Sequence, residues 1–200
     1  ISLDDISINA FAIIREAARR SLSMRPYDVQ MLAAFAMHDG KCVEMQTGEG
    51  KTLAAAVTVC LRALAGCGVH VLTFNDYLAR RDATWMGPLY RFLGLSVGYV
   101  IQGMPRQDRQ KAYNCEITYV TAKEVGFDFL RDHLSEHPEH RVQRGFHFAI
   151  ADEADSILID EGRTPLVIAT EAEKDKADLY KIAERVRPLR PGLHYEIKSS

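Results

Sequence analysis

Short apolar runs alternate with amphipathic stretches along most of this 200-residue chain. The runs have the length of strands, and the stretches between them repeat apolar residues at helical spacing. We expect strands at residues 42–45, 69–74, 96–101, 117–121, 146–151 and 166–169, and helices at 8–22, 29–37, 52–65, 77–93, 107–113 and 124–133. Such alternation predicts an α/β fold with a mostly parallel, doubly wound sheet.

The pattern changes near residue 166. A charged segment at 171–176 precedes one helical pattern that runs to Val186, and Pro188 and Pro191 then interrupt the chain. Two short elements cannot bury a core of their own. We therefore expect one α/β domain over residues 1–165, and over 166–200 a linker and the beginning of a second, incomplete domain.

Composition narrows the class of protein. The hydrophobic content of 47% is enough for a sizeable core, and a formal charge of −2 argues against a dedicated nucleic-acid binder. The four cysteines show no paired short spacing, so we expect reduced thiols and neither a disulfide framework nor a zinc site. No apolar stretch approaches the roughly 18 residues of a membrane span and no cleavable signal is visible, so any membrane role is expected to be peripheral.

Residues 45–52 carry the first functional motif, which ends in Gly-Glu-Gly-Lys-Thr. Glycines allow a backbone to curl around an anion, and the helix expected to follow directs its N-terminus at phosphates. Met45 stands where the phosphate loop usually has its first glycine, a variant that occurs in helicase-like motors. The motif predicts a nucleotide and Mg²⁺ site, with Lys51 on the β and γ phosphates and the Thr52 hydroxyl on the metal. Its residues are Thr47, Gly48, Glu49, Gly50, Lys51 and Thr52.

A second motif follows the almost unbroken apolar run at 146–151. Such a run is typical of a central parallel strand, and ligands bind at the carboxyl ends of parallel strands. Asp152 and Glu153 come directly after it. We predict that Asp152 holds the metal, partly through water, and that Glu153 polarises the attacking water. The alternative is that an acidic pair ends the strand simply because the chain meets water there.

Several longer strings are more specific than these ATPase motifs. They are Arg-Pro-Tyr-Asp-Val-Gln at 25–30, Asn-Asp-Tyr-Leu-Ala-Arg-Arg-Asp at 75–82, Gly-Phe-Asp-Phe-Leu-Arg-Asp at 126–132 and Asp-Ser-Ile-Leu-Ile-Asp-Glu at 155–161. With them, the chain resembles the first nucleotide-binding domain of the SecA preprotein translocase ATPases. The resemblance implies a RecA-like P-loop domain that binds ATP, with Gln30 reading the adenine, Arg25 supporting the same pocket, and a polypeptide-crosslinking domain inserted after about residue 165.

The resemblance also implies partners and a location. ATP hydrolysis would move unfolded preproteins through the Sec channel, from the cytoplasm, with the motor peripherally associated with the inner membrane and in possible contact with anionic lipid. Nucleic acid is not expected as a partner. Val120, Ala122, Lys123 and Gly162 depart from the family's usual residues. The first three lie where the lobes of the family communicate. The coupling of ATP hydrolysis to movement is therefore less firmly implied than nucleotide binding.

Two alternatives remain open. RNA or DNA helicases of the Asp-Glu-Ala-Asp type share the phosphate loop, the adenine-reading glutamine and the sequence at 152–155, but this chain lacks their backbone-gripping string. The chain could also be a nucleotide-binding module that does not hydrolyse ATP by itself. In related NTPases an arginine from another lobe or protein completes the site.

Overall fold

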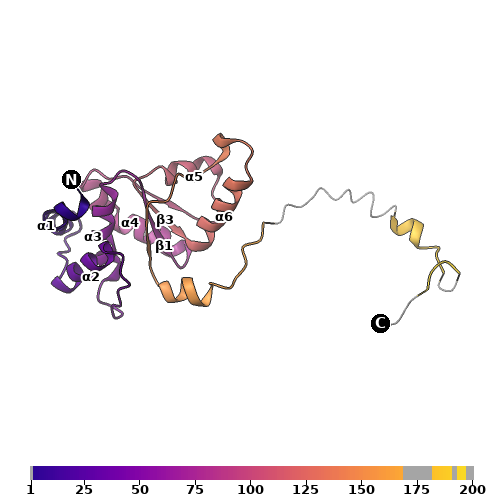
Figure 1. Cartoon of the computed structure of the whole chain (residues 1–200), viewed down its shortest axis with the longest axis horizontal. Helices are drawn as coiled ribbons and strands as arrows, with labels where there is room; N and C mark the ends of the chain where they lie inside the picture. The colour runs from indigo at the N-terminus through magenta and orange to yellow at the C-terminus, as the bar shows by residue number, and fades with distance from the viewer. Residues whose placement is uncertain (1, 169–181, 191–192, 197–200) are drawn as a thin grey trace. The chain divides into compact units, whose positions relative to one another are not determined.

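A computed structural model describes residues 2–168, 182–190 and 193–196 (Figure 1). The chain divides into two units, Ile1–Leu166 and Val167–Ser200. The strands and the six long helices all belong to the first unit. In the second unit, residues 182–186 are helical. The expected linker and incomplete domain at 166–200 lie partly outside the described residues, so that expectation stays a prediction.

A parallel sheet of four strands forms the centre of the first unit. Its strands are β1 (Val69–Thr73), β2 (Val97–Val100), β3 (Ile117–Thr121) and β4 (Phe148–Ala151), in the order β2-β3-β1-β4. The register places Val71 of β1 opposite Tyr119 of β3 and Ile150 of β4. All carboxyl ends therefore meet at one edge of the sheet, which is where parallel sheets bind ligands.

Helices cover both faces of the sheet. On one face α3 (Lys51–Ala63) packs against β1 and β4, and α4 (Asp76–Phe92) packs across β1, β2 and β3. Behind them lie α1 (Leu3–Leu22) and α2 (Asp28–His38). On the other face α5 (Arg106–Tyr113) packs against β2 and β3, and α6 (Ala122–Leu134) packs against β3. The predicted α/β, doubly wound sheet is confirmed.

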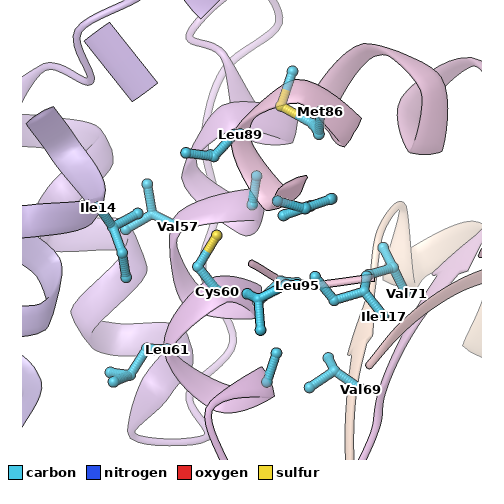
Figure 2. Packing of buried hydrophobic residues seen from close by; sticks show 14 of the residues in the cluster. Ile14, Val57, Cys60, Leu61, Val69, Val71, Met86, Leu89, Leu95 and Ile117 are labelled. Carbon is cyan, nitrogen blue, oxygen red and sulfur yellow. The ribbon is translucent and has the colours of Figure 1, made fainter. Parts of the chain in front are cut away.

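The core lies mainly between α3, α4 and the sheet. Figure 2 shows Val57 of α3 beside Ile14 of α1, and Cys60 on the side of α3 that faces Leu95 and the strand residues Val69 and Ile117. Successive strand residues point to opposite faces, so Leu72 instead joins a smaller cluster under α5 and α6. This second cluster contains Val100, Ala112, Tyr113, Val120 and Val142. The two clusters fix the sheet between its helical layers, and with it the edge that carries the functional residues.

Two predicted strands are absent from the described residues. Residues 42–45 form no strand, and no strand occurs at the described residues 166–168. A strand needs a hydrogen-bonded neighbour. Among the described residues β4 pairs only with β1, so residues 42–45 do not pair with the other side of β4. The N-cap of α4 is Asn75, whose side chain accepts a bond from the Leu78 backbone N–H at 2.9 Å.

Two further short helices occur in the first unit. A 3₁₀ turn, η1 (Pro138–His140), follows α6, and a five-residue π-helix, η2 (Ser156–Asp160), follows the acidic end of β4. The expected end of the helix at 77–93 is confirmed to within one residue, since α4 ends at Phe92. Gly94 has φ +77°, the left-handed conformation that commonly ends helices because glycine adopts it without a Cβ penalty.

Candidate nucleotide site

The phosphate loop is a tight turn that leads directly into α3. Gly48 and Gly50 have φ values of +89° and +77°, which favour glycine strongly over residues with a Cβ. Gly50 is the N-cap of α3 and no side chain caps that helix end, so the first backbone N–H groups of α3 are available to an anion. The carboxylate of Glu49 accepts a 2.8 Å bond from the Gln46 backbone and closes the turn.

Gln30 connects the phosphate loop to α2. Its side-chain oxygen accepts a bond from the Tyr27 backbone at 2.9 Å, and its nitrogen Nε2 donates to the Glu49 carbonyl at 2.8 Å. Gln30 is buried, with 6% of its surface exposed. An amide has two N–H donors and two lone pairs, so one of each remains for a ligand. The structure thus brings the predicted adenine reader against the phosphate loop.

Gly50 makes that contact possible. A Cβ at position 50 would lie 2.2 Å from Nε2 of Gln30. The absence of a side chain at this position is therefore required twice, once for the left-handed backbone and once for the approach of the glutamine.

The other loop residues are accessible at the same helix end. The Nζ atom of Lys51 donates to the Met45 carbonyl at 3.2 Å, so the ammonium lies over the loop. Thr47 and Glu49 are exposed, and Thr52 in the first turn of α3 is half-buried. Charge and hydroxyl are thus positioned beside the free N–H groups, as phosphate and metal binding require.

Arg25 makes no polar contact with these residues in the described part of the chain. Its side chain is exposed and makes no hydrogen bond or ion pair among the residues that the structure describes. The neighbouring segment is held instead by Arg15 of α1, which donates to the Pro26 carbonyl at 2.8 Å and pairs with Asp28 at 2.6 Å. The predicted role of Arg25 in the adenine pocket stays a prediction.

Asp152 and Glu153 lie at the carboxyl end of β4. The backbone N–H of Asp152 bonds to the Leu72 carbonyl at 2.9 Å, so this strand end is joined to the end of β1. Glu153 then turns away in the left-handed region at φ +51°, and its N–H donates to Oδ1 of Asp152 at 3.0 Å. Residues other than glycine rarely adopt this conformation, and it is found preferentially at functional sites. The turn separates the two carboxyl groups into a half-buried one and an exposed one.

The electrostatics of Asp152 favour a cation nearby. Burial raises the pKa of Asp152, and the carboxylate of Asp82 acts in the same direction. The Glu153 N–H, Lys51 and Arg81 oppose the rise and lower the pKa. A carboxylate whose charge is disfavoured by burial gains from a divalent cation, and this matches the predicted role of Asp152.

The donor set fits Mg²⁺ and not a metal held entirely by protein. Among the described residues no group of three or more histidine, cysteine, aspartate or glutamate side chains could hold a metal ion. Mg²⁺ commonly keeps several waters and takes one or two carboxylates together with phosphate oxygens. Asp152 and the Thr52 hydroxyl fit such a set, with the phosphates supplying the remaining ligands.

Two charged residues near this edge were missed as site residues. The sequence places Arg81 and Asp82 in the helix expected at 77–93, and no role was predicted for either. In the structure the Asp82 side chain is 2% exposed and pairs with Arg81, and both act on Asp152. An aspartate on the apolar face of an amphipathic helix was the available signal, since buried carboxylates are rare unless paired.

Among the described residues, no helix combines the length and apolar character needed to cross a membrane.

The model of the SecA DEAD-like domain family matches residues 1–195. A protein translocase subunit SecA from Carboxydothermus hydrogenoformans is 54% identical over 196 residues, covering 98% of this chain and 22% of the relative. One from Solidesulfovibrio magneticus is 56% identical over 194 residues, covering 97% of this chain and 23% of the relative.

A solved structure agrees with the fold. A hypothetical ATP-dependent RNA helicase from Sulfolobus tokodaii matches with a TM-score of 0.55 and 26% identity, covering 74% of this chain and 43% of that one. This neighbour supports the RecA-like interpretation of the sheet. The chain spans about a fifth of the length of the SecA relatives that it matches. Because the family model covers nearly the whole chain and these relatives share more than half of the aligned residues, the chain belongs to the SecA DEAD-like domain family.

Proposed function

We propose that this chain is the ATP-binding lobe of a SecA-type motor that couples ATP hydrolysis to the movement of unfolded preproteins through the Sec channel. The observation that carries the proposal is the 2.8 Å bond from Gln30 to the Glu49 carbonyl. It joins the predicted adenine reader to the phosphate loop, while the acidic end of β4 lies at the same edge of the sheet. Family membership supports the choice of polypeptide as the moving partner.

Each residue then has a defined role. Lys51 and the N–H groups at the start of α3 bind the phosphates, and Thr52 and Asp152 hold the metal, the latter partly through water. Mg²⁺, when bound, neutralises charge that develops on the phosphates. Glu153 orients a water for attack, because its carboxylate is exposed next to the buried one of Asp152. In this proposal an arginine from another lobe completes the site. The isolated chain lacks that arginine and is therefore expected to be a weak ATPase.

Partners and location follow from the same proposal. The clients are unfolded preproteins, the membrane partner is the Sec channel, and the motor acts in the cytoplasm as a peripheral protein of the inner membrane. Contact with anionic lipid is compatible with this arrangement. We further propose that residues 166–200 are the linker and beginning of the polypeptide-crosslinking domain.

Lys51 provides the direct test of the nucleotide site. Lys51→Ala should abolish Mg-ATP binding to the 200-residue chain, measured by calorimetry, because it removes the charge at the phosphates. The matched control is Lys41→Ala, a surface lysine whose 3.5 Å pair with Asp39 lies outside the loop. If Lys51→Ala binds Mg-ATP as the wild type does, the site assignment is wrong.

Gln30 tests base recognition. Adenine and guanine present opposite donor and acceptor order to an amide, so the wild type should prefer ATP to GTP and Gln30→Ala should lose that preference. Competition of each nucleotide against a fluorescent ATP analogue measures both affinities. Equal binding of ATP and GTP by the wild type would contradict the adenine-reading role.

An ATP-dependent RNA helicase is the second candidate, since the solved neighbour carries that name. A cavity of about 360 Å³ lies at the ends of β1 and β3, the position from which a helicase would grip the nucleic-acid backbone. Its lining contains Lys123 as its one cation and three acidic residues, Asp76, Glu124 and Glu161. Phosphate contacts depend on basic side chains, so this lining does not favour RNA.

The two candidates differ in what stimulates the ATPase of a full-length protein containing this chain. A translocase should respond to an unfolded preprotein together with channel-containing membranes, and Glu153→Gln should retain ATP binding but lose that response. RNA should have little effect at low or moderate salt. Strong, salt-sensitive stimulation by RNA with none from preprotein would replace the translocase proposal with the helicase.

A further inference from the structure

A cavity of about 440 Å³ is lined by residues of α5, α6 and η1, on the face of the sheet opposite the phosphate-loop helix α3. Its lining is rich in basic side chains, namely Arg106, Arg109, Arg131 and His140. The cavity at the ends of β1 and β3 has the opposite character, with one lysine and three acidic residues. The two cavities therefore favour ligands of opposite charge.

The two acidic residues in this lining, Asp128 and Asp132, are already satisfied by the protein. Asp128 Oδ2 accepts bonds from Arg109 at 2.7 Å and from the Tyr113 hydroxyl at 2.9 Å, and its Oδ1 accepts from Arg131 at 3.1 Å. The two oxygens of Asp132 accept backbone N–H groups of the segment after η1, at 2.9 and 2.8 Å. Every carboxylate oxygen in the lining thus has a donor from the chain itself, so these groups do not require a cation from outside.

Several donors of the same cavity are not used in this way. Arg106 is exposed, and its side chain makes no hydrogen bond or ion pair with the residues that the structure describes. Arg131 bonds to Asp128 through Nη1, whereas its Nε and Nη2 atoms have no partner in the described part of the chain. Helix α5 begins at Arg106 without a side-chain cap, so its first backbone N–H groups are also free. The cavity therefore presents unused donors from two arginines and a helix start.

The buried Arg109 fixes the loop from which α5 begins. Its Nε donates to the Met104 carbonyl and its Nη2 to the Ile101 carbonyl, both at 3.0 Å. Both carbonyls belong to the loop that joins the carboxyl end of β2 to α5. Ligands commonly bind at the carboxyl ends of parallel strands, and a loop held in place loses little entropy when a ligand binds.

We propose that this cavity binds a phosphate group through Arg106, Arg131 and the N–H groups at the start of α5. Guanidinium forks match phosphate oxygens geometrically, and a helix N-terminus favours an anion. Met104 and Val142 add an apolar wall, which suits a phosphate attached to an organic group, as in a small phosphate ester or a phospholipid headgroup. None of these residues belongs to the nucleotide site, so this site does not depend on the proposed function.

Glycerol 3-phosphate is the probe for the site. It is titrated by NMR into the 200-residue chain carrying Lys51→Ala, so that the phosphate loop contributes no binding. The amide signals of residues 106 and 107 should shift, and Arg106→Gln and Arg131→Gln should each weaken binding roughly tenfold. Glycerol, which lacks the phosphate, should cause no shift.

Arg80→Gln is the matched control. It removes the same charge from α4, where the Arg80 guanidinium lies 5.5 Å from the centre of the Tyr99 ring. Its affinity for glycerol 3-phosphate should equal that of the parent chain. Thermal unfolding identifies any variant that loses its fold. If Arg131→Gln unfolds because Asp128 loses a partner, Arg106→Gln gives the answer alone, since Arg106 has no partner to lose among the described residues.

Vesicle flotation distinguishes the two sources of phosphate. Flotation with phosphatidylglycerol but not phosphatidylcholine vesicles, lost in Arg106→Gln, would identify a lipid headgroup as the ligand. Binding of glycerol 3-phosphate without flotation would identify a soluble phosphate ester.

Three outcomes would overturn the assignment of a phosphate site to this cavity. These are no binding of either probe by the parent chain, unchanged affinity in both Arg106→Gln and Arg131→Gln, or an equal loss in Arg80→Gln. Mg-ATP binding by the chain with Lys51 intact is measured separately, and it should be unchanged in Arg106→Gln. Failure of the phosphate site would therefore leave the nucleotide site standing.

Discussion

Gly50→Ala should weaken nucleotide binding more than the equivalent change at the other loop glycine. The new Cβ meets two obstacles, a backbone at φ +77° and the Nε2 atom of Gln30 at 2.2 Å. Gln30 can swing aside because Nε2 is the far end of a flexible side chain, but it then loses its bond to the Glu49 carbonyl. The strain falls on the loop conformation that binds phosphate, so it appears as lost affinity.

The size of the expected loss in Mg-ATP affinity follows from the backbone strain and the lost hydrogen bond. A left-handed backbone costs a residue with a Cβ about 1–2 kcal/mol, and the lost hydrogen bond costs about 1 kcal/mol more. The sum, about 2–3 kcal/mol, corresponds to roughly a 30- to 150-fold loss of Mg-ATP affinity. At Gly48 the backbone cost applies alone, because a Cβ there meets nothing within 4 Å. Gly48→Ala should therefore lose only about 5- to 30-fold.

Calorimetric titration of Mg-ATP into the two alanine variants measures the difference. Repeating both changes in a Gln30→Ala background removes the side chain that the new Cβ would displace, so the excess cost at position 50 should disappear. Equal losses for Gly48→Ala and Gly50→Ala in the wild-type background would refute the reasoning. So would an excess cost at position 50 that survives in the Gln30→Ala background.

Two predictions concern the free energy of unfolding and the ionisable groups that are buried on the other face of the sheet. Burial and the nearby Arg144 lower the pKa of His70 to about 4, against about 6.5 in the unfolded chain. The free energy of unfolding is therefore highest above pH 6.5 and falls by up to about 3 kcal/mol as the pH drops to 4. Denaturant unfolding at pH 7 and pH 5 measures this, and a His70→Leu variant that shows the same pH dependence would contradict it. Arg109 pairs with Asp128 at 2.7 Å and Glu124 at 2.6 Å, so Arg109→Met should cost about 3–5 kcal/mol. Lys111→Ala removes only an exposed pair, and a loss as large as that of Arg109→Met would contradict the argument.

Much of the fold could be predicted because the strands read as continuous apolar runs. Covered on both faces, β1 and β3 contain no Asp, Glu, Lys or Arg, and their predicted bounds agree with the structure to within one residue. The segment at 42–45 has a similar pattern but no strand beside it. Periodicity describes what a segment can bury, whereas a strand exists only where another backbone completes its hydrogen bonds.

The sequence by itself determined the chemistry of the phosphate loop, because glycines, a lysine and a hydroxyl in this order act through local backbone geometry. It also determined that a carboxylate pair follows an apolar strand. The expectation that this strand is central was wrong, because among the described residues β4 lies at the edge of the sheet and Ile150 is its one buried residue. Tertiary structure alone decided which distant residues meet there. Gln30 reaches the loop across 19 positions, and Asp152 is joined to the end of β1 because parallel β1 and β4 lie side by side. Those contacts depend on strand order and helix packing, which no local pattern encodes.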